Sequence, residues 1–99
     1  MRIYISGAIK NDPDYQKKFD AVHKELDAEG HLVLNPTLLP KGLRDSEYMV
    51  IDLYLISIAD EVYMLKGWEE SSGAVIERLF AVRCGKTVKY EWSNAENDV

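Results

Sequence analysis

The chain has 99 residues, 46% of them hydrophobic, 29% charged and 10% aromatic, which is the size and composition of one globular domain. Its 12 basic and 17 acidic residues give a net charge of −5, which argues against a broad interface with polymeric nucleic acid. No apolar run is long enough to span a membrane, and the first residues do not resemble a signal peptide. Cys84 is the single cysteine, so an intrachain disulfide is excluded and a cytoplasmic protein is expected.

The chain is predicted to begin with a strand followed by a helix. Residues 2–6 (RIYIS) are β-branched and aromatic and stop at Gly7, as is typical of a buried strand. A helix is expected to begin at Asp12-Pro13, since proline suits a first turn, and to end at Gly30. Apolar side chains recur at helical spacing between these limits: Tyr15, Phe19, Val22 and Leu26.

The middle of the chain repeats this strand–helix order. Residues 31–34 form a short predicted strand that closes at Asn35-Pro36, and residues 37–43 form a loop. A second helix is expected from Asp45 or Ser46, with an apolar face of Tyr48, Ile51, Leu55 and Ala59. The remaining predicted segments follow in order: a strand over 61–65, a turn over 66–72, a helix from Ser72 or Gly73 to Cys84, a strand over 87–90 and an acidic tail over 91–99.

Strands that alternate with helices of ten or more residues predict an α/β fold with a parallel sheet. Right-handed crossovers then place helices on both faces, which gives a flavodoxin-like three-layer sandwich. We expect four strands in the order 2-1-3-4, within one domain over residues 1–90. Ligands of such sheets bind beyond the carboxyl ends of the strands, where the strand order reverses. Three loops converge there: residues 6–12, 35–43 and 66–73.

Two carboxylates stand out in predicted helices. The neighbours of Glu77 at helical spacing offer no ion pair: Gly73, Ala74, Phe80 and Ala81. Asp52 has an equally apolar setting, formed by Tyr48, Met49, Leu55 and Ile56. A carboxylate on an apolar face near the binding edge is costly unless the site uses it. The alternative is that each acid reaches solvent or pairs with a basic residue across the fold.

Other residues near this edge have both a structural and a functional interpretation. Tyr4, close to the carboxyl end of the first strand, either packs in the core or brings its hydroxyl to the site. Ser71 and Gly73 open a helix whose free N–H groups suit a phosphate, although a serine there is also an ordinary N-cap. Trp68 either covers a base or fills the loop.

Three short motifs together resemble the nucleoside 2-deoxyribosyltransferase superfamily: YISGAI at residues 4–9, IDL at 51–53 and SSGAVIE at 71–77. The spacing is similar to that of the 2′-deoxynucleoside 5′-monophosphate N-glycosidases and of small phage-type members. The resemblance extends through Val88, and its specificity comes from all three motifs occurring in order on the expected elements.

The resemblance implies roles for particular residues. Glu77 matches the family's nucleophile, Asp52 the acid that helps the base depart, and Tyr4 the tyrosine that hydrogen-bonds the nucleophile. Ser71 stands where the monophosphate hydrolases carry a serine, which favours a 5′-monophosphate ligand. The loop over residues 10–13 departs from the pattern, because it lacks the second glycine cluster and the arginine, and Glu69 and Glu70 add negative charge. The expected substrate-binding set is Ser6, Gly7, Ile9, Asn35, Trp68, Ser71 and Gly73.

The function implied by the resemblance is cleavage or transfer at the N-glycosidic bond of a small nucleoside or nucleotide, without a metal or other cofactor. One alternative is a nucleotide-binding or sensor module that has lost catalysis. Another is a structural protein with the same fold and no pocket beside Glu77. The resemblance also implies a homodimer or larger homo-oligomer, with the second or third helix at its interface and the tail around Ser93 and Asn94 reaching the partner's site.

Overall fold

A computed structural model of the protein describes residues 1–91, and the expectations for Ser93 and Asn94 lie outside this range. The helices and strands follow in order: β1 (Arg2–Ser6), α1 (Tyr15–Ala28), β2 (Leu32–Leu34), α2 (Asp45–Ile58), β3 (Glu61–Met64), α3 (Ser72–Arg83) and β4 (Thr87–Tyr90). Two 3₁₀ turns, η1 (Pro36–Leu38) and η2 (Trp68–Glu70), lie in the loops that follow β2 and β3.

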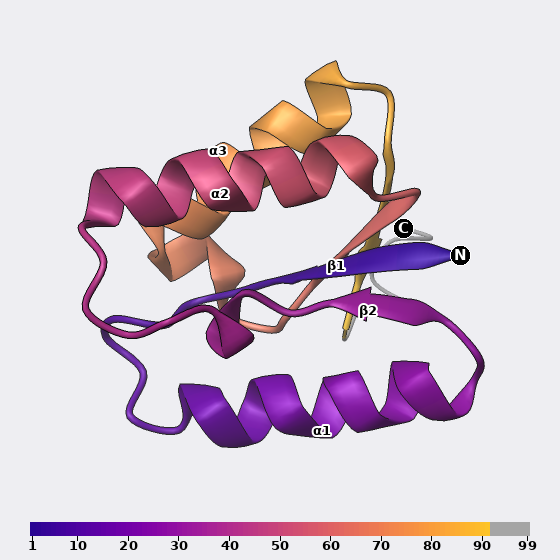
Figure 1. Ribbon diagram of the computed structural model, residues 1–99, viewed down its shortest axis with the longest axis horizontal. Helices are drawn as coiled ribbons and strands as arrows, with labels where there is room; N and C mark the ends of the chain where they lie inside the picture. Colours follow the sequence, from indigo (N-terminus) through magenta and orange to yellow (C-terminus); the bar gives the residue numbers. More distant parts are fainter. Residues whose placement is uncertain (92–99) are drawn as a thin grey trace.

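The four strands form one parallel sheet in the order β2-β1-β3-β4, as predicted. Tyr4 of β1 lies opposite Leu34 of β2 and Val62 of β3. Helix α1 covers one face of the sheet, while α2 and α3 lie together on the other face (Figure 1). The fold class and the three layers are therefore confirmed, with β1 in the interior of the sheet.

The alternation of side chains along β1 divides the core between the two faces. Ile3 and Ile5 point to the α1 face, where they pack with Phe19, Val22 and Leu26. Tyr4 points to the opposite face, where it packs with Ile56, Val62, Met64, Ala74 and Ala81. Ser6 has the same parity as Tyr4 and is therefore directed to the α2 and α3 face. This parity brings two polar side chains of β1 under the two helices that carry the candidate acids.

Two sequence-based expectations are wrong in detail. Helix α1 begins at Tyr15 rather than at Asp12-Pro13, because the Asp12 carboxylate accepts the Asp14 N–H (2.9 Å) and holds a turn before the helix. In α2, Asp52 and Ile56 are buried, whereas Ile51 and Leu55 of the expected face are half-buried. Helix α2 is apolar around most of its circumference, so spacing alone does not select the face that packs on the sheet.

Candidate active site

A cavity of about 790 Å³ opens at the carboxyl ends of the strands, where the strand order reverses. Its walls come from the three loops that the sequence predicted to converge there, together with the first turns of α2 and α3. Asp52 and Glu77 both line this cavity. An open cavity with two carboxyl groups in its wall therefore lies where a ligand is expected to bind to such a sheet.

Glu77 is the more deeply held of the two acids. Its side chain leaves α3 towards the sheet and is 7% exposed. The hydroxyl of Ser6, at the end of β1, donates a hydrogen bond of 2.7 Å to Glu77 Oε1. Asp52 approaches from α2 and is 8% exposed. Neither acid reaches bulk solvent or a basic partner among residues 1–91, so the structural interpretation of these carboxylates is not supported.

The local environment makes both acids hold their protons more tightly than usual. Burial raises the pKa of Glu77 to about 8, the hydrogen bond from Ser6 opposes this rise, and the nearby charge of Asp52 adds to it. Burial also raises the pKa of Asp52, against the effect of its interactions with Glu77 and Tyr4. Below about pH 8 the pair therefore holds at least one proton.

Tyr4 completes this group of buried polar side chains. Burial and then the charges of Glu77 and Asp52 raise the pKa of the Tyr4 hydroxyl, so it stays protonated at neutral pH. The Tyr4 hydroxyl and Asp52 Oδ1 have no hydrogen-bond partner among residues 1–91. Buried polar atoms without partners are costly, and they concentrate at functional sites. This cluster can donate, accept and hold a proton beside an open cavity.

Ser71 and Gly73 lie where α3 begins and line the cavity. The Ser71 hydroxyl accepts the N–H of Ala74 (3.2 Å), so it is an N-cap as well as a wall residue. The other N–H groups of this first turn have no acceptor within the helix and point towards its amino-terminal end. This end of α3 therefore presents partial positive charge to the cavity.

Gly7 and Ile9 line the cavity from the loop after β1. A Cβ atom at Gly7 would approach the Leu65 Cβ to 3.0 Å, so a larger residue here would force the loop or Leu65 to shift. Ser6 therefore makes a buried polar contact, and the adjacent Gly7 allows the backbone to pass close to Leu65.

Three expected ligand-binding residues lie outside the cavity wall: Asn35, Trp68 and Ser6, whose hydroxyl donates to Glu77. Asn35 is buried behind this wall, accepts the N–H of Thr37 (2.9 Å) and contacts His23 Nδ1 (3.0 Å). Its Oδ1 also accepts the hydroxyl of Thr37 (2.7 Å), and Thr37 lines the cavity. Trp68 packs against the ring of Tyr90 and beneath the guanidinium of Arg78. The tryptophan fills the region between η2 and β4, which is the packing interpretation left open by the sequence.

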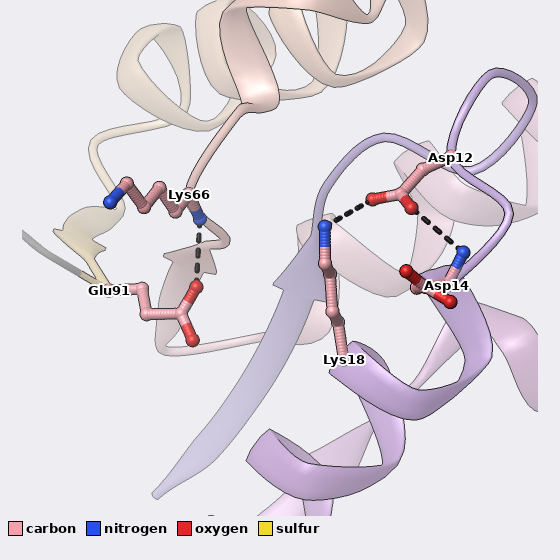
Figure 2. Close-up of polar contacts among 5 residues, drawn as sticks. All are labelled: Asp12, Asp14, Lys18, Lys66 and Glu91. Carbon is pink, nitrogen blue, oxygen red and sulfur yellow. Dashed lines mark hydrogen bonds and ion pairs between the residues drawn. The ribbon is translucent and has the colours of Figure 1, made fainter.

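Sequence reasoning missed four lysines that line the cavity: Lys10, Lys18, Lys41 and Lys66. Lys10 pairs with Asp45, and Lys18 pairs with Asp12 at 2.6 Å (Figure 2). The Lys66 N–H binds Glu91 Oε1 (2.9 Å; Figure 2), whereas its ammonium has no partner within residues 1–91. The available signal was that Lys10, Lys41 and Lys66 lie in the three converging loops and Lys18 in the first turn of α1, although the expected cation was an arginine.

Residues 1–91 contain no group of three histidine, cysteine or carboxylate side chains placed to hold a metal ion. The same part of the chain has no helix that is both long and apolar enough to cross a membrane. The polar groups at the cavity include the pair of carboxyl groups, hydroxyl groups, the amino terminus of α3 and lysines.

Comparison with known protein families assigns this chain to one of them. The family model described as Domain of unknown function (DUF4406) matches residues 1–90. The chain belongs to this family. No curated protein matches the DUF4406 chain by sequence.

Solved structures similar to this DUF4406 chain include a 2-deoxyribosyltransferase from Bacillus psychrosaccharolyticus, with 22% identity, a TM-score of 0.75, and coverage of 91% of this chain and 71% of that one. A CMP N-glycosidase from Clostridium botulinum has 20% identity, a TM-score of 0.71 and coverage of 91% and 70%. A 2-deoxyribosyltransferase from Leishmania mexicana has 19% identity, a TM-score of 0.73 and coverage of 90% and 62%. The first two are members of the nucleoside 2-deoxyribosyltransferase superfamily, so the resemblance is confirmed for the fold.

Proposed function

We propose that this protein cleaves or transfers the N-glycosidic bond of a (deoxy)nucleoside or its 5′-monophosphate, with Glu77 as the nucleophile. The observation that carries the proposal is the buried pair of Glu77 and Asp52 in the wall of one cavity, beside the Tyr4 hydroxyl. The activities named for the structural neighbours, deoxyribosyl transfer and CMP N-glycosidic cleavage, support the same bond as the target.

The chemistry requires two carboxyl groups in different protonation states. An ionised Glu77 attacks C1′ of the sugar, the bond between C1′ and the base nitrogen breaks, and the base leaves with the electron pair of that bond. Asp52 supplies the proton that the departing base needs. Water or a second base then attacks C1′, returns a proton to Asp52 and releases Glu77. Water as acceptor gives a hydrolase, and a base as acceptor gives a transferase.

The raised pKa of Glu77 adds a condition to this scheme. The free site keeps a proton on Glu77 below about pH 8, whereas attack requires the proton to be on Asp52. A proton must therefore move from Glu77 to Asp52 before or during substrate binding. Tyr4 remains a proton donor throughout, because burial keeps its hydroxyl protonated, and it is suited to stabilise Glu77 as that carboxylate forms.

A 5′-monophosphate is the ligand class that we favour. The amino terminus of α3 at Ser71 and Gly73 offers N–H groups to an anion, and a serine at this position adds no repelling charge. Lys66 also lines the cavity and adds a positive charge at this edge of the sheet. Glu70 also lines the cavity and opposes phosphate binding, so the preference depends on α3 and Lys66 outweighing that charge.

We further propose that the protein acts as a homodimer or larger homo-oligomer through α2 and α3. Exposed apolar side chains gather on these helices: Val50, Tyr54, Val75, Ile76, Leu79 and Val82. Ile76 belongs both to this apolar surface and to the cavity wall, so a neighbouring subunit seated here would border the site. Sedimentation equilibrium at micromolar concentration tests this arrangement, and a purely monomeric mass would reject it.

Incubation with a panel of nucleosides, deoxynucleosides and their 5′-monophosphates tests the activity, with released base separated by chromatography. A second base added to each reaction distinguishes transfer, which yields a new nucleoside, from hydrolysis. A 2′-fluoro-arabinosyl substrate slows breakdown of a covalent intermediate and should leave a sugar ester on the Glu77 peptide in mass spectrometry. Binding of the panel without base release would instead favour the nucleotide-binding alternative.

A further inference from the structure

Ser6 has a contact that a substrate-binding residue would not need. Ser6 is 0% exposed and lies outside the cavity wall. Its hydroxyl donates a hydrogen bond of 2.7 Å to Oε1 of Glu77, 71 residues further along the chain. A ligand in the cavity therefore meets Glu77 but not Ser6. The expectation that Ser6 binds substrate is replaced by a contact made behind the acid.

We propose that Ser6 is a positioning residue, which anchors Oε1 of Glu77 so that Oε2 is the atom presented to C1′, and which favours the ionised form of this carboxyl group. The inference rests on the proposed function for its catalytic consequence. The anchoring itself concerns only the hydrogen bond between β1 and α3 and can be measured without a substrate.

The geometry of the buried cluster supports this role. Three groups face Glu77: Tyr4 and Ser6 from β1, and Asp52 from α2. The Tyr4 hydroxyl and Asp52 Oδ1 have no hydrogen-bond partner within residues 1–91, whereas Ser6 donates directly to Glu77. A carboxylate with one oxygen fixed loses most of its freedom to rotate, and this restriction holds the other oxygen in one direction.

The same bond affects which carboxyl group holds the shared proton. A hydroxyl that donates to a carboxylate stabilises the charged form, so Ser6 acts against the burial that keeps Glu77 protonated. The reactive arrangement needs Glu77 ionised and Asp52 protonated. Ser6 therefore increases the fraction of molecules that are ready to react, although it does not touch the reacting atoms.

The ordinary alternative is that Glu77 merely satisfies a buried serine hydroxyl. Ser6→Ala separates the two interpretations, and Ser57→Ala is the matched control, because Ser57 is an exposed serine of α2 whose hydroxyl donates to Tyr54 O. Ser6→Cys keeps the side-chain volume with a much weaker donor, so it provides the same test if the alanine variant does not fold.

We expect both Ser6 variants to reduce kcat by about 10- to 100-fold, as for loss of a hydrogen bond to a charged group, with KM changed by less than about twofold. The fall in rate at alkaline pH should move to higher pH, because Glu77 then keeps its proton longer. Carbon-13 NMR of the Glu77 carboxyl group should show the same upward displacement of its titration. Ser57→Ala should match the wild type in all three measurements.

An unchanged kcat and an unchanged Glu77 titration in a folded Ser6 variant would overturn the proposal, as would an equal loss of kcat without any displacement in pH. If the wild-type protein releases no base from any substrate, the proposed function fails separately. The carbon-13 NMR titration of Glu77 then tests the anchoring alone. Ser6 anchors the carboxyl group only if the Ser6 variants move that titration to higher pH.

Discussion

The two faces of the sheet are built from the same strands but differ in what they bury. The α1 face is apolar throughout its buried cluster, with Ile3, Ile5, Phe19, Val22, Leu26 and Leu65. The α2 and α3 face interrupts a similar cluster with four buried polar side chains: Tyr4, Ser6, Asp52 and Glu77. Polar groups without full hydrogen bonding reduce stability, so the second face gives up stability that the first retains.

This difference indicates a division of labour within a small domain. The α1 face stabilises the fold by burying apolar surface, and the fully buried side chains of its cluster do not line the cavity. The α2 and α3 face holds the two candidate acids, and both of its helices contribute residues to the cavity wall. Substitutions of buried apolar residues on the α1 face should therefore lower stability without changing chemistry, whereas substitutions of the two buried acids should lower activity without lowering stability.

The strongest test of the comparison is Glu77→Ala. We expect base release to fall by roughly 10⁴-fold or more, as for removal of a covalent nucleophile, while the fold is kept. Alanine is the better helix former, and no helical ion pair is lost. Chromatography of released base and circular dichroism on the same sample provide the measurement. Glu25→Ala on the exposed side of α1 should leave base release unchanged, and a Glu77→Ala variant that unfolds but keeps its specific activity would reverse the assignment.

The matching change on the opposite face is Phe19→Ala. Phe19 is 0% exposed, and its removal from an apolar core should cost about 3–5 kcal/mol of unfolding free energy. Activity per folded molecule should be retained, because Phe19 contacts neither the cavity nor its acids. Urea denaturation with an assay below the transition tests both statements. A loss of kcat in the fully folded protein would show that the faces are coupled.

Asp52→Asn should have a smaller effect on rate than Glu77→Ala. The amide keeps the shape of the side chain but cannot protonate the base, so kcat should fall by about 10²- to 10⁴-fold. The wild-type kcat/KM should decline above about pH 8, where the pair loses its last proton, and this decline should disappear in the variant. With a 7-methylguanine nucleotide, whose cationic base leaves without added protonation, the Asp52→Asn substitution should lower kcat much less than it does with an uncharged base.

The comparison also explains which features could be predicted from the sequence. Strand and helix alternation predicted the order β2-β1-β3-β4, and the rule for parallel sheets located the cavity before any motif was considered. Glu77 and Asp52 were found because each is a carboxylate without a helical partner on an apolar face, and because both lie near the predicted binding edge. Their roles came from the family resemblance and remain proposals.

The rest depends on distances that a linear pattern does not contain. The bond from Ser6 to Glu77 requires the rotation of α3 about its axis and a particular Glu77 side-chain conformation. The pairing of Lys10 with Asp45 joins the loop after β1 to the first residue of α2, and the distance between them depends on how α2 packs. Trp68 was ambiguous because a tryptophan in a loop covers either a ligand or a neighbouring aromatic ring, here that of Tyr90.

The smallest expected effect concerns stability, and its sign follows from the raised pKa of Glu77. The folded protein holds this proton up to about pH 8, whereas the unfolded chain releases it near the ordinary value for glutamate. The stability contributed by protonated Glu77 is therefore complete below the unfolded pKa and is lost as pH rises to about 8. Glu77→Gln keeps an uncharged acceptor for Ser6 at every pH. It should match the wild type near pH 4.5 and become the more stable protein above pH 8, by at least the roughly 1.4 kcal/mol that one unit of pKa displacement represents, which is at least about 4–8 °C in Tm.

Thermal melts of Glu77→Gln and of the wild type across this pH range give the measurement, with the same substitution at Glu25, an exposed residue of α1, as the matched control. The cost of ionising Glu77 in the folded state is the stability that the α2 and α3 face gives up for its chemistry. A Glu77→Gln variant less stable than the wild type at pH 9 would mean that the ionised carboxylate is stabilised where it lies. Glu77 would then have a structural role like that of the buried residues on the α1 face, and the contrast between the two faces would not hold.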